Sequence, residues 1–141
     1  MKRTTVGFLI LCLICLIAGC AKKEPQKATL TLPSNPTTGY QWTAAQDPEI
    51  FEISSEYIEN QHADGVVGVG GNEVFTLTPV KDGQTEVCFT YVRPWENVEP
   101  DTSLRYVLKV SKDKQIEMQS FAGALPGGID QLPEMPSLVI E

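Results

Sequence analysis

Asn35-Pro36-Thr37-Thr38-Gly39-Tyr40 is a polar stretch that separates two segments in which apolar and polar residues alternate. Before it, Leu30 and Leu32 fall on one face of a predicted strand. After it, Tyr40 and Trp42 fall on one face of a second predicted strand. The proline of the stretch fixes φ and its glycine permits a positive φ. The stretch is therefore typical of a stiff turn that presents its two threonines.

The chain up to Lys112 continues this pattern of short strands separated by turns. Four more segments carry alternating or dense apolar residues, and none has a helical period. Lys81-Asp82-Gly83 is a tight-turn signal between two of them. The pattern predicts an all-β fold built as a β-sandwich, with strands over residues 28–32, 40–44, 50–53 (reaching toward residue 58), 73–80, 84–92 and 103–111.

Two later loops are as unusual in composition as the first. Gly65–Gly71 is rich in glycine, and Arg93–Glu96 contains a proline and a tryptophan. If each strand crosses the sandwich once, the first, third and fifth connections all lie at the same end. The loop Asn35–Tyr40 and these two loops are therefore predicted to lie together, as the binding loops of immunoglobulin-like sandwiches do.

Each later loop also has a plain structural interpretation. Residues 65–71 fit a flexible connection; they match neither a P-loop nor a dinucleotide fingerprint, whose third glycine would fall at Glu73. Glycines beside valines also suit pairing with an extended partner. Arg93-Pro94-Trp95 fits a loop whose indole folds back on the sandwich, but arginine and tryptophan are also enriched in binding hot spots.

In this order and on a β pattern, the motifs Asn35-Pro36-Thr37-Thr38-Gly39-Tyr40, Gly68-Val69-Gly70-Gly71 and Arg93-Pro94-Trp95 resemble those of the chagasin family of cysteine peptidase inhibitors. The resemblance covers about residues 28–111. It implies an immunoglobulin-like β-sandwich and reversible inhibition of papain-like cysteine peptidases. It also implies that the threonine tip enters the active-site cleft, with Thr37 nearest the catalytic Cys–His pair. The glycine motif would then run along the substrate side, and Arg93 and Trp95 would pack on the leaving-group side.

The N-terminus has the features of a secretory signal, since two basic residues precede an uncharged apolar run. Leu16-Ile17-Ala18-Gly19-Cys20 resembles the lipobox of prokaryotic lipoproteins, which implies that residues 1–19 are removed and that Cys20 takes a diacylglycerol. An ordinary cysteine after an ordinary signal is the alternative. The lipid interpretation makes the membrane a partner through Cys20 and predicts an extracytoplasmic protein anchored to the cell membrane or the outer membrane.

The chain is thus divided into four predicted regions. They are a signal peptide (1–19), a lipidated cysteine with a tether (20–27), an immunoglobulin-like inhibitor domain (28–111) and a C-terminal extension (112–141). The extension is rich in glycine and proline but ends in the apolar Leu138-Val139-Ile140. It fits either a disordered segment or an added edge strand, because family members usually carry another strand before the region that matches residues 28–32.

Charge and cysteine content argue against other classes of protein. The net charge is -7, and removal of the signal leaves 9 basic and 18 acidic residues, which does not suit a nucleic-acid partner. His62 is the only histidine, and Cys88 is the only cysteine after Cys20. These are too few for a zinc site, and their placement does not suggest a catalytic dyad. No enzymatic activity, metal or cofactor is expected, and the domain is expected to act as a monomer. The alternative function is a non-inhibitory surface binding module with an exposed Trp95.

Overall fold

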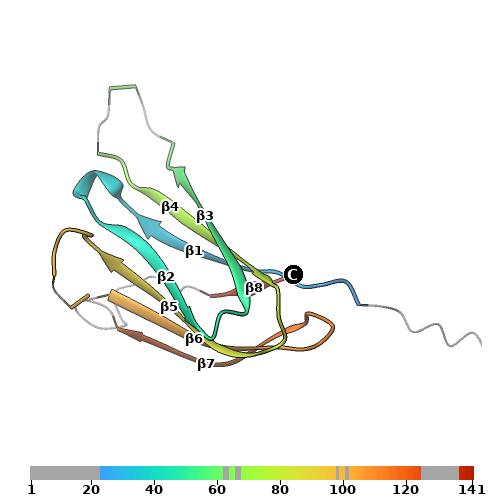
Figure 1. Cartoon of the computed structure of the whole chain (residues 1–141). Coiled ribbons are helices and arrows are strands. Elements are labelled where there is room, and N and C mark those ends of the chain that lie inside the picture. The colour runs from blue at the N-terminus through green and yellow to red at the C-terminus, as the bar shows by residue number, and fades with distance from the viewer. Residues whose placement is uncertain (1–22, 62–63, 66–67, 98, 101, 125–136) are drawn as a thin grey trace, which may run out of the picture.

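The computed structural model describes residues 23–61, 64–65, 68–97, 99–100, 102–124 and 137–141. These residues form two antiparallel sheets packed face to face (Figure 1). One sheet has the strand order β3-β4-β1-β8 and the other β2-β5-β6-β7. The elements are β1 (Ala28–Ser34), η1 (Pro36–Thr38, a 3-10 turn), β2 (Gln41–Asp47), β3 (Phe51–Glu59), β4 (Gly71–Pro79), β5 (Gly83–Val92), β6 (Thr102–Val110), β7 (Ile116–Ala124) and β8 (Val139–Ile140). The predicted all-β, immunoglobulin-like sandwich is confirmed.

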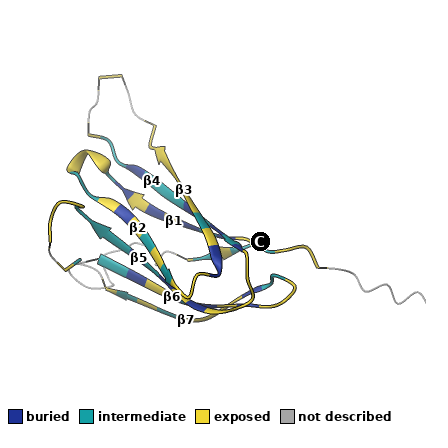
Figure 2. Ribbon diagram, viewed as in Figure 1, coloured by how far each residue is buried: buried dark blue, intermediate teal, exposed yellow. Residues whose placement is uncertain are grey.

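The core is built from the alternating side chains that the sequence pattern indicated. Every second residue of β1, β5 and β6 points between the sheets (Figure 2). Phe89 is central, because its ring meets those of Phe75 and Tyr106 edge to face, at centroid distances of 4.9 and 5.9 Å. Each buried apolar side chain contributes roughly 1.5–3 kcal/mol. Cys88 is half-buried and free, so no disulfide contributes within the described residues. The buried apolar residues are Ala28, Leu30, Leu32, Trp42, Ile50, Phe51, Phe75, Leu77, Val87, Phe89, Leu104, Tyr106, Leu108, Val110 and Ile116.

The strand register brings three loops to one end of the sandwich. Ser34 at the end of β1 pairs with Gly71 at the start of β4. Gln41 at the start of β2 pairs with Val92 at the end of β5. Figure 1 shows the loops that follow β1, β3 and β5 at the same end. The gathering of the three unusual loops, predicted from strand parity, is confirmed; this end is called the loop end below.

The sandwich continues beyond residue 111, where the sequence interpretation had ended it. β7 pairs with β6, with a register shift between Val107 and Leu108. β8 pairs with the first two residues of β1 and lies at the edge of that sheet. Only Ile116 of β7 is buried, so this edge strand lacks the alternation by which a strand is recognised.

The residues just before β1 are fixed to both sheets at the end opposite the loops. Lys27 and Glu141 exchange two backbone hydrogen bonds of 2.8 and 2.9 Å. The backbone N–H of Gln26 donates to the Lys114 carbonyl at 3.0 Å, and the backbone N–H of Ile116 donates to the Gln26 side chain at 2.8 Å. The described part of the predicted tether, from residue 23 onward, therefore lies against the domain, because backbone groups on both sides of it are available for hydrogen bonding.

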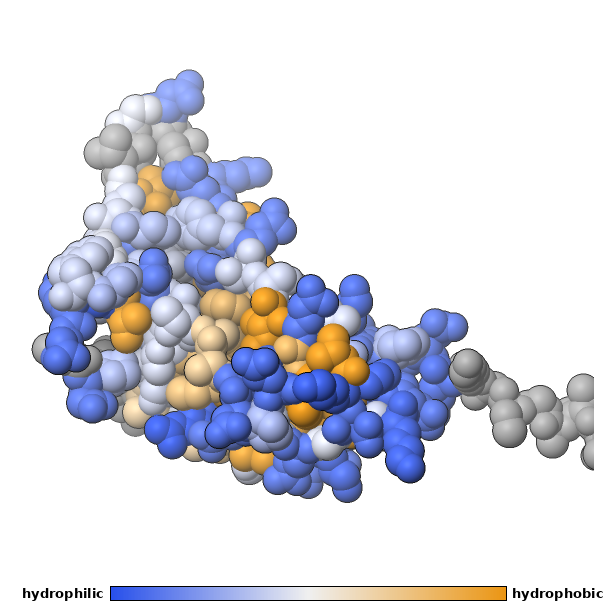
Figure 3. Space-filling view, viewed as in Figure 1, coloured by the Kyte–Doolittle hydropathy of each residue, from blue (hydrophilic) through white to orange (hydrophobic). Residues whose placement is uncertain are grey.

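The surface is mainly hydrophilic. Figure 3 shows apolar residues along the open side, between the edges of the two sheets, with hydrophilic residues around them. Within the described ranges, no helix has the length and apolar character needed to cross a membrane. The predicted signal peptide and Cys20 lie outside the described residues.

Candidate functional site

The tip of the first loop is a single 3-10 turn held by Asn35. The Thr37 backbone N–H and the Thr37 hydroxyl both approach the Asn35 Oδ1, at 3.3 and 2.6 Å. The Thr38 N–H and hydroxyl both donate to the Asn35 carbonyl, at 3.1 and 2.7 Å. Gly39 closes the turn in the left-handed region at φ 81°, and its N–H donates to the Pro36 carbonyl. Asn35 thus stabilises the tip through its side chain and its backbone together.

These contacts fix the direction of the Thr37 hydroxyl. Asn35 Oδ1 accepts from a backbone N–H, and its Nδ2 donates to the Gly68 carbonyl at 3.3 Å, so the amide orientation is set at both ends. The Thr37 hydroxyl therefore donates its hydrogen bond to the Asn35 Oδ1. The lone pairs of this exposed hydroxyl remain available to accept a hydrogen bond from outside.

The glycine motif lies beside the tip. The Asn35–Gly68 hydrogen bond joins the two loops, and the Asn60 N–H donates to the Gly70 carbonyl at 3.2 Å. Gly71 is buried, and a Cβ there would overlap the Ile58 carbonyl and lie 2.7 Å from the Tyr57 hydroxyl. Partial burial, followed by the charge of Glu59, raises the pKa of the Tyr57 phenol. A glycine is needed at residue 71 because β3 and the Tyr57 ring pack directly on it.

Arg93 and Trp95 reach the tip from its other side. The Arg93 guanidinium lies over the Tyr40 ring at 4.3 Å from the centroid, and the same group is paired with Glu96 at 3.0 Å. The hydrogen bond that Arg93 donates to the Glu96 carboxylate raises the pKa of Arg93. Pro94 and Trp95 form the turn between them, closed by an N–H···O bond of 3.0 Å from Glu96 to Arg93. Trp95 is 70% exposed, and its indole lies against Gly39.

Tyr91 is a site residue that lies outside the three motifs and that the sequence interpretation did not single out. It lies near the end of β5, and its hydroxyl accepts the Asn35 backbone N–H at 3.1 Å. Its ring stacks on Tyr40 at 5.1 Å and contacts Trp42 at 4.9 Å. The Trp42 indole N–H in turn donates to the Pro33 carbonyl at 2.9 Å. The signal that points to Tyr91 is its position, two residues before the Arg93 motif.

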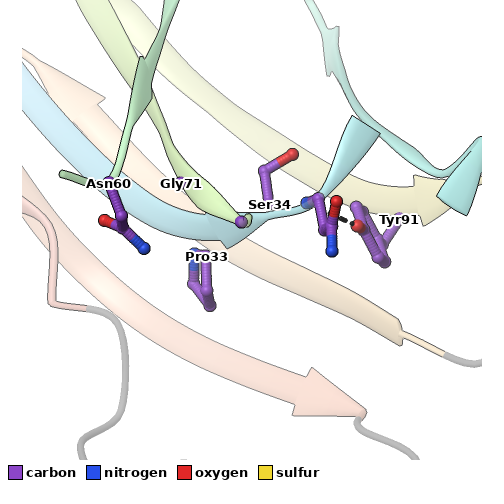
Figure 4. A pocket seen from close by; sticks show the side chains of 7 residues that line it. Pro33, Ser34, Asn60, Gly71 and Tyr91 are labelled. Carbon is purple, nitrogen blue, oxygen red and sulfur yellow. Dashed lines mark hydrogen bonds between the residues drawn. The ribbon is translucent and has the colours of Figure 1, made fainter. Parts of the chain in front are cut away.

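A shallow hollow of about 360 Å³ lies behind the tip. Figure 4 shows Asn60 on one side of it and Tyr91 on the other, with Ser34 and Gly71 between them. It lies between the first loop and the start of β4.

The structure thus brings together every residue that the sequence singled out for binding. The residues of the three motifs, Asn35 to Tyr40, Gly68 to Gly71 and Arg93 to Trp95, all lie at the loop end, and the tip contacts both neighbouring loops. Among the residues with described positions, no group of three or more His, Cys, Asp and Glu is arranged to hold a metal ion. The arrangement is a rigid, convex three-part surface, which suits insertion into a cleft.

The chain is similar to Amoebiasin-1 of Entamoeba histolytica, with 34% identity over 82 residues that make up 58% of this chain and 78% of that protein. It is similar to Chagasin of Trypanosoma cruzi, with 32% identity over 79 residues, or 52% of this chain and 70% of that protein. Its fold is similar to the crystal structure of the cysteine protease inhibitor EhICP2 from Entamoeba histolytica, with a TM-score of 0.52, 30% identity and coverage of 59% of this chain and 77% of that chain.

The family model described as "Chagasin family peptidase inhibitor I42" matches residues 23–110. This range runs from the segment before β1 to the end of β6 and contains all three loops. The chain therefore belongs to the chagasin family of peptidase inhibitors.

Proposed function

We propose that this protein is a reversible inhibitor of papain-like cysteine peptidases and that it blocks the active-site cleft with the three loops of the loop end. The observation that carries the proposal is the mutual contact of the loops: Asn35 bonds to Gly68, and Trp95 lies against Gly39. Loops that are already fixed to one another lose little conformational entropy on docking, which favours tight binding.

In this mechanism the tip with Thr37 and Thr38 enters the cleft and no bond is made or broken. Papain-like sites pair a thiolate with an imidazolium. The Thr37 hydroxyl, whose proton is held by Asn35, can accept a hydrogen bond from the imidazolium N–H. A hydroxyl offers no acyl group for attack, so its contact with the catalytic pair forms no covalent bond, and no residue of this chain needs catalytic chemistry.

The flanking loops supply area and orientation. Gly68–Gly71 covers the substrate side of the cleft, and Arg93 and Trp95 cover the leaving-group side. Three such loops can bury about 800 Å² on each partner, which is a standard protein–protein interface. A single domain suffices for this mode of binding, so the inhibitor acts as a monomer.

The test is an inhibition panel of papain-like peptidases, with a serine peptidase as the control. Inhibition of at least one papain-like peptidase at micromolar inhibitor, with the serine peptidase unaffected, is expected. Thr37→Trp should weaken inhibition without lowering the melting temperature, because the tip is exposed and its side chains lie outside the core. If the panel is negative, the exposed Trp95 favours the alternative of a non-inhibitory binding module.

We also propose that the protein is a lipoprotein. The support is the lipobox-like Leu16–Cys20 after a short apolar run, together with the place where residue 23 enters the domain, at the end opposite the loops. In this proposal residues 1–19 are removed, a diacylglycerol on Cys20 anchors the chain to the cell membrane or the outer membrane, and the loops face away from the bilayer. Incorporation of a labelled fatty acid that disappears in Cys20→Ser is the expected result; a label retained by that variant would contradict it.

A further inference from the structure

The described charges are unevenly divided between the two ends of the sandwich. The loop end carries six carboxylates and two basic groups, one of which is already paired with one of the carboxylates at 3.0 Å. These groups are Glu56 and Glu59 in the second half of β3, Asp64 in the following loop, Glu73 at the start of β4, Glu96 and Glu99 after β5, Arg93, and Arg105 in the first half of β6. Six carboxylates against two guanidinium groups leave four negative charges there.

The described lysines lie toward the opposite end. They occur before β1, in the turn between β4 and β5, late in β6 and in the turn between β6 and β7: Lys23, Lys27, Lys81, Lys109, Lys112 and Lys114. Outside the loop end, the described residues include nine carboxylates and six basic groups, which leave three negative charges. Within the described residues, the loop end is therefore acidic and contains no lysine.

Exposed apolar side chains occur at the same end. Trp95 is 70% exposed, Ile58 is 51% exposed and Tyr57 is 36% exposed. Exposed apolar side chains among charged ones are common on surfaces that bind another protein. The acidic residues lie on the loops and strand ends that flank the tip, where they would face the rim of a target's cleft.

We infer that the loop end fits a papain-like peptidase whose active-site cleft is bordered by basic side chains, and that attraction between the two surfaces accelerates their association. This inference rests on the proposed function and specifies the partner. Complementary charge acts mainly before contact, by steering the encounter, and it raises association rates by roughly ten- to a thousandfold. Dissociation depends mainly on the contacts made by the loops themselves.

The experiment measures association and dissociation rate constants with the full chain kept in mild detergent. The partners are two papain-like peptidases, one with a basic and one with an acidic surface around the cleft. Sodium chloride is varied from about 20 to about 500 mM, which shortens the range of electrostatic attraction from roughly 20 Å to below about 5 Å. The loop-end variant is Glu56→Gln/Asp64→Asn/Glu99→Gln. The matched control is Glu49→Gln/Asp82→Asn/Glu117→Gln, which removes the same charge from exposed residues away from the loop end.

With the basic peptidase, salt and the loop-end variant are each expected to slow association about tenfold and to change dissociation less than about twofold. The control variant should associate within about twofold of the wild type. Three results would overturn the inference and leave the proposed function intact. They are an association rate with the basic peptidase that does not change with salt, an equal effect of the two variants on that rate, and faster association with the acidic peptidase. Absence of inhibition at every salt concentration would remove the proposed function and this inference with it.

Discussion

The indole of Trp95 occupies the space beside Gly39 into which a Cβ at residue 39 would project. This contact ties the third loop to the closing residue of the tip. A glycine is required at residue 39 for two reasons. Its φ of 81° lies in the left-handed region, and a larger residue would displace the indole.

Gly39→Ala is therefore expected to weaken inhibition by at least about tenfold, because the added Cβ strains the closing residue by roughly 1–2 kcal/mol and also displaces the indole. The inhibition constant against a sensitive papain-like peptidase is the measurement. Gly65→Ala is the matched control, since Gly65 has a φ of 87° and open space around it. Equal inhibition constants for the two variants would show that the Trp95 contact is unimportant.

Tyr91→Phe should weaken inhibition by about fivefold and lower the melting temperature by no more than about 8 °C. The variant keeps the ring stacked on Tyr40 but removes the hydroxyl that accepts the Asn35 N–H. One lost hydrogen bond is worth about 1 kcal/mol. Prolonged incubation with the peptidase, followed by mass spectrometry, should also detect faster cleavage near Thr37, because the tip is less rigid. An unaltered inhibition constant and cleavage rate would show that Tyr91 acts only in packing.

Trp95→Ala should cost about 2 kcal/mol or more of binding free energy, as expected for an exposed aromatic anchor. Met118→Ala is a suitable control, because Met118 is an exposed apolar residue on β7, away from the three motifs. Titration calorimetry with an inactivated papain-like peptidase measures both. If the two variants bind equally well, Trp95 does not take part in the interface.

The alternation of apolar and polar residues within each segment was sufficient to predict the first six strands. The number of strands that precede each loop was then sufficient to predict that the three loops lie at one end. It was not sufficient for β7, in which only Ile116 is buried and the register shift in β6 breaks the regular pairing. β8 consists of two residues, which is too short for any periodicity. The pattern left open whether residues 137–141 would pair with β1.

The side-chain network at the site was harder to predict for a different reason. Alternation places Tyr91 on the inward face, but it does not say that the hydroxyl reaches the backbone of Asn35. The contact of Trp95 with Gly39 likewise depends on the packing of two loops that are distant in sequence. Motifs identified the residues, whereas their mutual contacts required the three-dimensional arrangement.

Ile140→Ala should lower the unfolding free energy by about 1–2 kcal/mol, because Ile140 pairs with Ala28 and packs against the core. Val139→Ala should have little effect, since Val139 is 48% exposed and points the other way. Denaturant unfolding followed by tryptophan fluorescence measures both variants. Equal stability of the two would mean that β8 does not form in solution.

The stability of the domain should fall in alkaline solution through Tyr106. Burial raises the pKa of Tyr106 to about 12, whereas an unfolded tyrosine titrates near pH 10. The folded state therefore keeps the phenol protonated, so this contribution is complete below about pH 10 and is lost as the pH rises through about 12. The expected loss is roughly 2 to 3 kcal/mol. In Tyr106→Phe, the unfolding free energy between these pH values should decrease less steeply; an identical slope would contradict the assignment.

Lys27 and Glu141 are hydrogen-bonded to each other at the end of the sandwich farthest from the loops. Any attachment made at either of these residues, whether to a lipid, a second protein or a solid support, therefore leaves the threonine tip unobstructed. The three loops could then be exchanged as a set while the point of attachment stays the same. The domain has the geometry of a display scaffold, in which immobilisation and recognition are separated by the full length of the strands.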